Sequence, residues 1–425
     1  MIVIGVALAL LALMGAPLFA VIAAGAMLSF HLAGIDPSVL AIEVFRLAEM
    51  PVLLAIPLFT FAGYLVSESG APGRLVRLTS ALLGWVPGGL AVISLGACAF
   101  FTAFTGASGV TIIALGAVLY PALKEAGYGE KFNLGLITTS GSLGLLFAPS
   151  LPLILYGIVA QQSGTGEAVS IDTLFRAGIL PGLLMLVLLS GWSLWVNRHI
   201  RTSFKAFSWQ QVKDAIRETV WELPLPFVVL GGIYSGYFAV SEAAAVTALY
   251  VIIVEVFIYR EVHLGQLPEV MRKSMLLVGG VLIILGVSMA STTSMIDGGV
   301  PARLFEFVRS HVDSQLTFLI LLNCFLLVLG SMLDIFSALV LVVPLILPVA
   351  AGYGIHPAHL GIIFLANMQI GYITPPIGMN LFIASYRFEK PVLTLYRATL
   401  PFFFILLLSV AIITYVPDLS LWLIR

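Results

Sequence analysis

The chain contains the string Phe104-Thr105-Gly106-Ala107-Ser108-Gly109. This string interrupts an apolar run, Leu90 to Leu119, and leaves about 10 to 15 residues on each side, enough for half-helices of roughly 15–22 Å at about 1.5 Å per residue. Half-helices of that length are shorter than the roughly 30 Å hydrocarbon core of a bilayer. We therefore predict a re-entrant helical hairpin at residues 90–124, with the quoted string as its tip.

Three further interruptions repeat this pattern. A predicted helix at 132–160 breaks around Ala148-Pro149-Ser150, a second hairpin at 316–351 has the tip Gly330-Ser331-Met332-Leu333-Asp334, and a helix at 358–386 breaks at Thr374-Pro375-Pro376-Ile377-Gly378. Irregular backbone at membrane depth is tolerated only where it is buried in protein or lines a water-filled cavity. Single Gly or Pro residues can merely kink packed helices, but four breaks at matched positions predict one central site.

The composition places these breaks in a membrane protein. Of the 425 residues, 60% are apolar and 10% are charged, and the mean hydropathy is +1.10. Soluble proteins are about 25% charged, so a water-soluble enzyme is excluded. At about 20 apolar residues per span, we expect roughly eight to ten crossings besides the two hairpins. A net charge of −1 gives no basic field for nucleic acid.

Two short strings recur at nearly one offset and indicate a duplicated unit. Residues 70–75, Gly-Ala-Pro-Gly-Arg-Leu, match 299–304, and the Ala-Gly-Tyr-Gly string at 126–129 recurs at 351–354. We predict two repeats, 1–215 and 216–425, each with scaffold helices, a hairpin and a broken helix. Short amphipathic segments are expected to lie along the membrane interface as braces. These braces are 37–50 and 74–83 in the first repeat and 301–312 in the second.

The distribution of Lys and Arg predicts that the two repeats are inverted. Lys124 and Lys131 flank the first Ala-Gly-Tyr-Gly string, whereas no basic residue lies near the second. The basic loops 198–217 and 260–273 are expected on the cytoplasmic side. Inverted repeats with broken helices near the bilayer midplane are typical of secondary transporters. No basic segment precedes the first apolar stretch, Ile2 to Leu13, so we expect no cleaved signal peptide.

Three acidic residues in or near apolar runs have more than one interpretation. Asp334 at the second tip is either a cation ligand or the N-cap of the following half-helix, and one carboxylate can serve both purposes. Glu242 is explained structurally if Ser241 is an N-cap and Glu242 lies in the first helical turn. Glu255 lies near a predicted cytoplasmic end, from which its side chain can reach water.

These strings resemble the large membrane subunit of TRAP (tripartite ATP-independent periplasmic) transporters, the DctM-like family, over essentially the whole chain. The most specific stretch runs from Gly330 through Pro344, Pro348, Gly361, Asn367 and Gly371 to the segment 374–382. The segments 105–152 and 236–245 add to the resemblance.

The resemblance implies an all-α, ion-transporter-superfamily fold with an elevator mechanism. It also implies a Na⁺ symporter of organic acids such as dicarboxylates in the bacterial inner membrane. The transporter would work with a small four-helix membrane subunit and a periplasmic substrate-binding protein, and would need no cofactor besides Na⁺ as the coupling ion.

The residues that the resemblance assigns to Na⁺ lie at both tips and both breaks. They are Thr105, Gly106, Ser108, Ala148, Pro149 and Ser150 in the first repeat, and Gly330, Ser331, Asp334, Thr374, Pro375 and Gly378 in the second. The residues expected to bind substrate are Ser108, Gly109, Ser150, Ser331, Thr374 and Asn380. Relatives often have two adjacent serines at the first tip, whereas Ala107 leaves Ser108 alone here, so backbone carbonyls are the firmer ligands at that tip.

Two alternatives to this interpretation differ in what they require of the chain. A stand-alone Na⁺-coupled di- or tricarboxylate transporter of the same fold would work without a binding protein. An intramembrane enzyme would need a nucleophile with a base, a metal cluster or a carboxylate pair at one depth. The sequence places no His inside a predicted span and no two acids together at mid-membrane, so we predict that the chain is not an enzyme.

Overall fold

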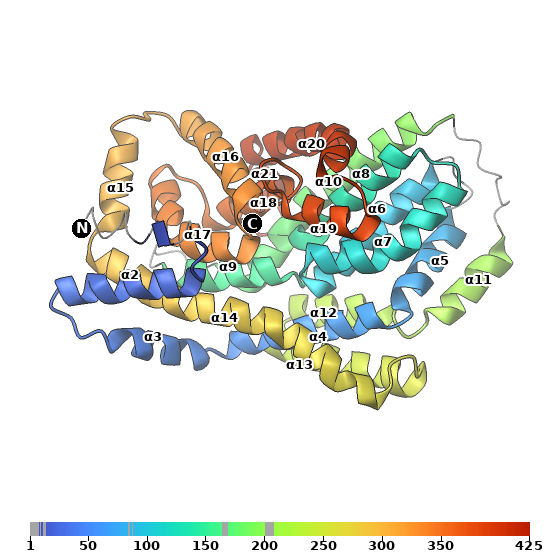
Figure 1. Ribbon diagram of the computed structural model, residues 1–425, viewed down its shortest axis with the longest axis horizontal. Coiled ribbons are helices and arrows are strands. Elements are labelled where there is room, and N and C mark those ends of the chain that lie inside the picture. The colour runs from blue at the N-terminus through green and yellow to red at the C-terminus, as the bar shows by residue number, and fades with distance from the viewer. Residues whose placement is uncertain are drawn as a thin grey trace.

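The computed structural model describes residues 8, 10–11, 14–83, 86, 88–163, 169–199 and 208–425, which form helices and no strand (Figure 1). Most of the stretch Ile2 to Leu13, for which we expect no cleavage as a signal peptide, lies outside the described residues. The first half comprises α2 (Leu18–Leu32), α3 (Val39–Ala48), η1 (Pro51–Leu54), α4 (Ala55–Glu68), α5 (Ala71–Leu83), α6 (Gly89–Thr105), α7 (Ser108–Glu125), α8 (Glu130–Ser140), η2 (Leu143–Leu146), α9 (Leu151–Gln162) and α10 (Ile171–Val196).

The second half follows a similar order of elements. It comprises α11 (Trp209–Glu218), α12 (Pro224–Tyr234), α13 (Val240–Ile252), η3 (Ile253–Ile258), η4 (Leu264–Gln266), α14 (Leu267–Asp297), α15 (Val300–Arg309), α16 (Gln315–Met332), α17 (Ile335–Gly352), α18 (Pro357–Gly371), α19 (Met379–Phe388), α20 (Val392–Tyr415) and α21 (Asp418–Leu421). A long helix, a short helix, a hairpin, a broken helix and another long helix occur in this order in both halves. The halves differ at Pro51, where η1 separates α3 from α4, whereas α14 runs unbroken for 31 residues.

The hairpin arms are longer than predicted. They contain 17 or 18 residues each, which is about 26–27 Å at 1.5 Å per residue. The prediction was wrong because it counted only apolar residues, whereas α7 continues through Pro121 into the polar turn that contains Lys124. Eight helices in the described residues are long and apolar enough to cross a membrane, or nine if the bent pair 130–162 counts as one span, and three of the eight are hairpin arms. Length and apolarity alone therefore do not separate an arm from a crossing.

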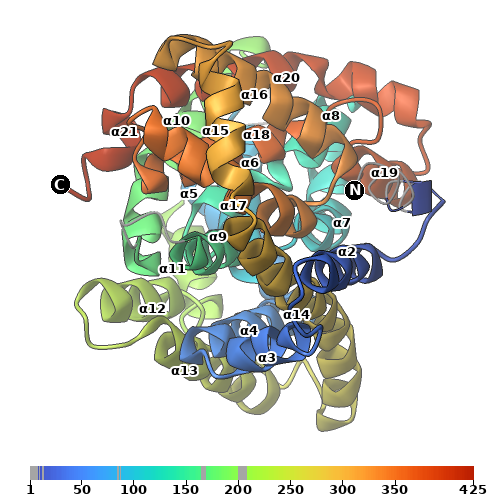
Figure 2. The ribbon, with the colours of Figure 1, turned by 90° about the vertical axis from the view of Figure 1, so that its left-hand side faces the viewer.

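The helices form two layers. One layer contains α2, α3, α4, α13 and α14, which pack against one another along one long side of the molecule (Figures 1 and 2). The other contains both hairpins, both broken helices, α10 and α20. The short helices α15 and α5 lie at opposite ends of the long axis, where α15 packs on α17 and α5 packs on α6 and α11 (Figure 1). The tips and breaks lie between these ends.

Candidate functional site

The first tip lies against the first break. Gly106, which ends α6, has a left-handed backbone (φ 65°), and its N–H donates to the Thr102 carbonyl at 2.8 Å. A Cβ at Gly106 would lie 2.5 Å from Cδ1 of Leu151, the first residue of α9. The Thr102 hydroxyl donates to the carbonyl of Gly141, at the start of the break, at 2.8 Å. Residues 141–150 therefore pack directly on the hairpin.

The second tip lies against the second break in the same way. The Gly378 N–H donates to the Ser331 carbonyl at 3.1 Å, and the Ile335 N–H donates to the Tyr372 hydroxyl at 2.8 Å. Gly378 itself has a left-handed backbone (φ 60°). Both breaks also contain a cis X-Pro bond, Ala148–Pro149 in the first and Pro375–Pro376 in the second.

Two glycines, one near each break, allow these close approaches. A Cβ at Gly144 would overlap the backbone of α6 at Ala99 and Ala103, and a Cβ at Gly371 would overlap the backbone of α16 at Gly330. Each broken helix thus touches the backbone of a hairpin arm, where no side chain fits. These contacts hold each tip and its break in one unit.

Contacts between the halves bring the two units together. The Asn380 side chain donates through Nδ2 to the Thr138 carbonyl at 3.2 Å, and a Cβ at Gly109 would lie 2.7 Å from Ile383 Cδ1. Conversely, α9 packs on α17, and the Tyr156 hydroxyl donates to the Pro357 carbonyl at 2.6 Å. All four interruptions therefore surround one region of the molecule.

Most of the predicted site residues are buried. The buried ones are Thr105, Gly106, Ser108, Ala148, Pro149, Ser150, Gly330, Ser331, Gly378 and Asn380. Gly109, Asp334 and Thr374 are partly buried, and Pro375 is exposed. The structure thus brings the whole predicted set to the two tips and two breaks, and the second break is more open than the first.

The hydroxyl groups in this set donate to nearby carbonyls. Ser150 donates to Leu145 at 2.7 Å, Ser331 to Val328 at 2.7 Å and Thr374 to Ile370 at 2.8 Å. A hydroxyl that donates a hydrogen bond can still accept one through its oxygen lone pairs. Four helices also end at the interruptions and four begin there, so the carbonyl ends and the amide ends of helices meet in one region. Such a place suits a cation and an anion side by side.

Asp334 is the N-cap of α17. Its Oδ1 accepts from the backbone N–H groups of Phe336 and Ser337, each at 3.0 Å, and its Oδ2 accepts from the Ser337 hydroxyl. The corresponding residue at the first tip, Ala107, has no side chain that could cap α7. The capping interpretation of Asp334 is therefore correct, and a ligand role would have to use its remaining lone pairs.

Glu242 lies in the first turn of α13 as predicted, but the predicted N-cap of that helix, Ser241, was wrong by two residues. The N-cap of α13 is Ala239, and the Glu242 carboxylate accepts from the Ala239 N–H at 2.9 Å. Ser241 lies inside the first turn instead. The error arose because a Glu three residues after the cap can bond back to the cap amide, which leaves the cap position free for an alanine.

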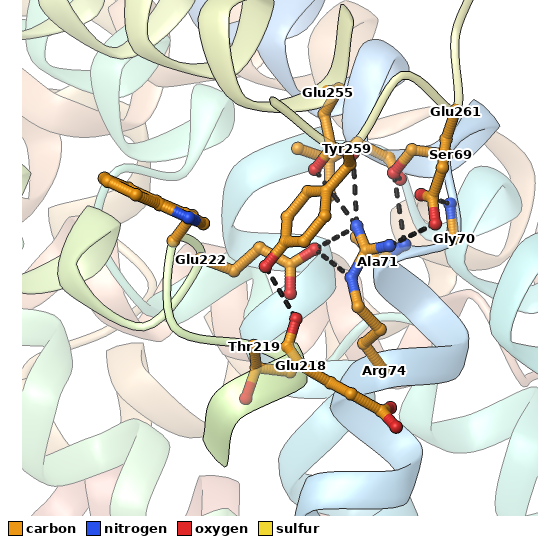
Figure 3. Close-up of polar contacts among 12 residues, drawn as sticks. Ser69, Gly70, Ala71, Arg74, Glu218, Thr219, Glu222, Glu255, Tyr259 and Glu261 are labelled. Carbon is orange, nitrogen blue, oxygen red and sulfur yellow. Dashed lines mark hydrogen bonds and ion pairs between the residues drawn. The ribbon is translucent and has the colours of Figure 1, made fainter. Parts of the chain in front are cut away.

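A second polar centre, which sequence reasoning missed, surrounds Arg74 on α5 (Figure 3). The buried guanidinium donates to Glu222 through Nε at 2.8 Å, to Glu255 through Nη2 at 3.1 Å, and to Glu261. Its Cζ lies 3.9 Å from the centroid of the Tyr259 ring. The expectation that Glu255 reaches water was wrong, because only 1% of this residue is exposed.

Further contacts extend the Arg74 cluster into the neighbouring segments. Glu261 also accepts from the Gly70 N–H at 2.7 Å, and the Tyr259 hydroxyl donates to the Glu218 carbonyl at 2.6 Å (Figure 3). Burial raises the pKa of Glu222, although its bond to Arg74 opposes the shift. The cluster therefore joins α5 to α11, to the segment before α12, and to η3 and the residues that follow it.

One histidine lies deeper than the sequence suggested. His359 is in the first turn of α18, is 4% exposed, and has Nε2 3.3 Å from the Thr414 carbonyl. The sequence placed it at the end of an apolar stretch that begins at Leu360, but α18 begins at Pro357, because a proline at the first position is compatible with helix formation.

Two hairpins and two interrupted helices around one centre define an all-α, polytopic membrane protein of the transporter type. The family model described as "Tripartite ATP-independent periplasmic transporter, DctM component" matches residues 4–419. The chain therefore belongs to the DctM family of TRAP transporter components, as its motifs suggested.

Individual relatives agree with this assignment. The chain is 34% identical over 388 residues to the C4-dicarboxylate TRAP transporter large permease protein DctM of Pseudomonas aeruginosa, covering 90% of this chain and 88% of the relative. It is 32% identical to the isethionate TRAP transporter permease protein DctMQ of Oleidesulfovibrio alaskensis, covering 87% of this chain and 58% of that protein. These relatives are permease subunits and not enzymes.

A solved structure has a similar fold. The crystal structure of the Alcanivorax borkumensis YdaH transporter, whose title reports an unusual topology, aligns with a TM-score of 0.61 at 14% identity. The alignment covers 90% of this chain and 87% of that one. At this identity the likeness concerns the fold alone.

Proposed function

We propose that this chain is the large transmembrane subunit of a Na⁺-coupled secondary transporter that imports an organic acid across the bacterial inner membrane. The observation that carries the proposal is the meeting of both tips and both breaks in one region. Freed carbonyls and hydroxyl oxygens there suit Na⁺, and helix N-termini attract an anion. Two relatives are named for small organic anions, C4-dicarboxylates and isethionate, which supports an anionic substrate.

The proposed Na⁺ sites follow the two units. In the first, carbonyl oxygens of the tip 105–108 and of the break 148–150 would supply the ligands. In the second, the tip 330–334 faces the break 374–378, and Asp334 adds a negative charge. The substrate anion would lie between them, at the N-termini of α7, α9 and α19, near Ser108, Gly109, Ser150, Ser331, Thr374 and Asn380.

The proposed mechanism is of the elevator type. The hairpins, the broken helices, α10 and α20 would move as a block against the layer of α2, α3, α4, α13 and α14. The Arg74 cluster fits a rigid scaffold, since it ties α5 to several segments by ion pairs.

The proposed partners are a small four-helix membrane subunit and a periplasmic substrate-binding protein. The DctMQ relative is longer than this chain, which covers 58% of it. We expect its additional part to correspond to a separate small subunit here. The alternative is a stand-alone transporter that takes its substrate directly from the periplasm.

Uptake by reconstituted proteoliposomes tests this function. The chain, its small subunit and its binding protein would be given labelled C4-dicarboxylates, isethionate and acetate, with an inward gradient of Na⁺ or of K⁺. We expect uptake of one organic acid only with Na⁺ and only with the binding protein. Uptake that ignores the Na⁺ gradient would refute coupling, and Na⁺-driven uptake without the binding protein would establish the stand-alone alternative.

A further inference from the structure

Gln369 on α18 is a buried amide with no partner for either of its polar atoms. The residue is 0% exposed, and neither Nε2 nor Oε1 has a hydrogen-bond partner. Among the described residues it is the one amide side chain in which both atoms are buried and unpaired. Unpaired buried polar groups cost stability, so this amide needs a partner that this conformation does not supply.

The position of Gln369 on its helix directs it away from the hairpin arm. Asn367, two residues earlier, donates to Asn323 on α16 at 2.6 Å, and Gly371, two residues later, touches Gly330 on the same helix. A step of two residues turns the side chain by about 200°. Gln369 therefore lies on the opposite face of α18, a helix that also packs on η2, α9 and α10. Gly361, eight residues earlier and about 80° around the helix, touches Tyr156 on α9, so this side of α18 faces the first broken helix.

The second break begins one turn after Gln369. The backbone carbonyl of Tyr372, three residues on, accepts from the Asn380 N–H at 3.1 Å. The Asn380 side chain donates to the Thr138 carbonyl on α8, and its buried Oδ1 has no partner. The next residue on α8, Thr139, also has a buried, unpaired hydroxyl. Unpaired polar atoms thus occur on both broken helices, each within two residues of a helix end at a break.

We propose that Gln369 is a substrate-selecting residue of the transport site, which donates through Nε2 to an anionic oxygen of the substrate and accepts through Oε1 from the water that hydrates it. The inference rests on the proposed function and adds a residue to it. The amide is unpaired in this structure and gains its partners when substrate enters between the broken helices.

The test uses two variants of nearly the same size in the complete transporter. Gln369→Met removes both polar atoms, and Gln369→Glu keeps an acceptor but brings a negative charge toward the anion. Ser193→Ala on α10 is the matched control, since it removes another buried, unpaired polar group outside the tips and breaks. Each variant is measured for its melting temperature in detergent and for its initial rate of uptake of the anion that the wild-type assembly transports in the panel above.

We expect Gln369→Met to melt at the same or a higher temperature than the wild type while its uptake falls by about tenfold, the effect of one lost hydrogen bond to a charged group. Gln369→Glu is expected to transport less than Gln369→Met, and Ser193→Ala to transport normally. The Na⁺ concentration for half-maximal uptake should not change in Gln369→Met.

Several outcomes would overturn the inference. Normal uptake by Gln369→Met would exclude a substrate-selecting role. So would a loss of uptake that comes with a lower melting temperature in this variant, and so would better transport by Gln369→Glu than by Gln369→Met. The last result would indicate a cation ligand instead. Absence of uptake in the wild-type assembly would reject the proposed function, and the inference with it.

Discussion

The two hairpin tips have similar backbones and different side-chain chemistry. The second tip begins α17 with Asp334, whose carboxylate accepts two backbone N–H groups and a hydroxyl. The first tip begins α7 with Ala107, which provides no cap. The breaks also differ, because residues 141–150 are almost entirely buried, whereas Pro375, Pro376 and Ile377 are exposed. The comparison teaches that a repeated backbone can give one half a charged tip with an exposed break and the other half a neutral tip with a buried break.

The largest expected effect tests whether the shared backbone plan is essential in both halves. Gly144→Ala and Gly371→Ala each place a Cβ into the backbone of a hairpin arm, which has no flexible atom to move. We expect each to cost more than about 3 kcal/mol and to reduce the yield of folded protein, measured by fluorescence-detected size exclusion.

The control for this prediction is Gly96→Ala in the middle of α6. Nothing lies within 4 Å of its Cβ position, so the change should be neutral or stabilising. If only one of the two site glycines proved sensitive, the two halves would not share this packing.

The second prediction compares the braces of the two halves. Arg74→Met leaves three carboxylates without their cation and is expected to cost about 3–5 kcal/mol, whereas Arg303→Met, at the matching and exposed position in α15, should cost less than about 0.5 kcal/mol. Thermal unfolding in detergent measures both. Equal melting temperatures for the two variants would contradict the scaffold role of Arg74.

The Arg74 variant should also respond to pH. Burial raises the folded-state pKa of Glu222 above its unfolded value, so protonation favours the folded state. The stability from this group is full below the unfolded pKa and is lost as the pH rises through the folded pKa. We expect Arg74→Met to regain part of its stability when the pH falls from 8 to 5, and a melting temperature that rises with pH would contradict this sign.

The third prediction separates two roles of Asp334 at the second tip, helix capping and the supply of a negative charge. Asp334→Ala should cost about 1 kcal/mol of stability, whereas Asp334→Ser, which keeps a capping oxygen, should cost little. Both variants are expected to lose Na⁺-dependent uptake in proteoliposomes, because both lose the carboxylate that we propose for the second Na⁺ site. Unchanged transport by Asp334→Ser would reduce Asp334 to a helix cap.

The smallest expected effect comes from adding a capping side chain to the first tip, which lacks one. Ala107 has an extended backbone (φ −130°, ψ 113°) that suits an N-cap residue. Ala107→Ser should therefore stabilise the protein by about 0.5–1 kcal/mol, measured as a rise in melting temperature. Ala107→Val, which has no capping oxygen, is the control. An equal rise in both variants would point to packing rather than capping.

Local signals explain how much the sequence could predict. Glycine and proline act on their own backbone, so strings such as 104–109 and 374–378 revealed both tips and both breaks. Helix ends were harder, because α7 extends past its apolar residues and α13 is capped by an alanine. The Arg74 cluster could not be predicted, since its partners lie 148 to 187 residues away and no local pattern encodes their approach. Gln369 escaped notice for a similar reason, because only the packed structure reveals that its amide is unpaired.

The Arg74 cluster has a consequence for biosynthesis. Arg74 leaves the ribosome well before Glu222, Glu255 and Glu261, and its nearest carboxylate partner is synthesised 148 residues later. Until then a guanidinium that ends up buried must stay hydrated or be held by the insertion machinery. The cluster can therefore be completed only after α13 and η3 have been made, so the packing around α5 matures during translation of the second half.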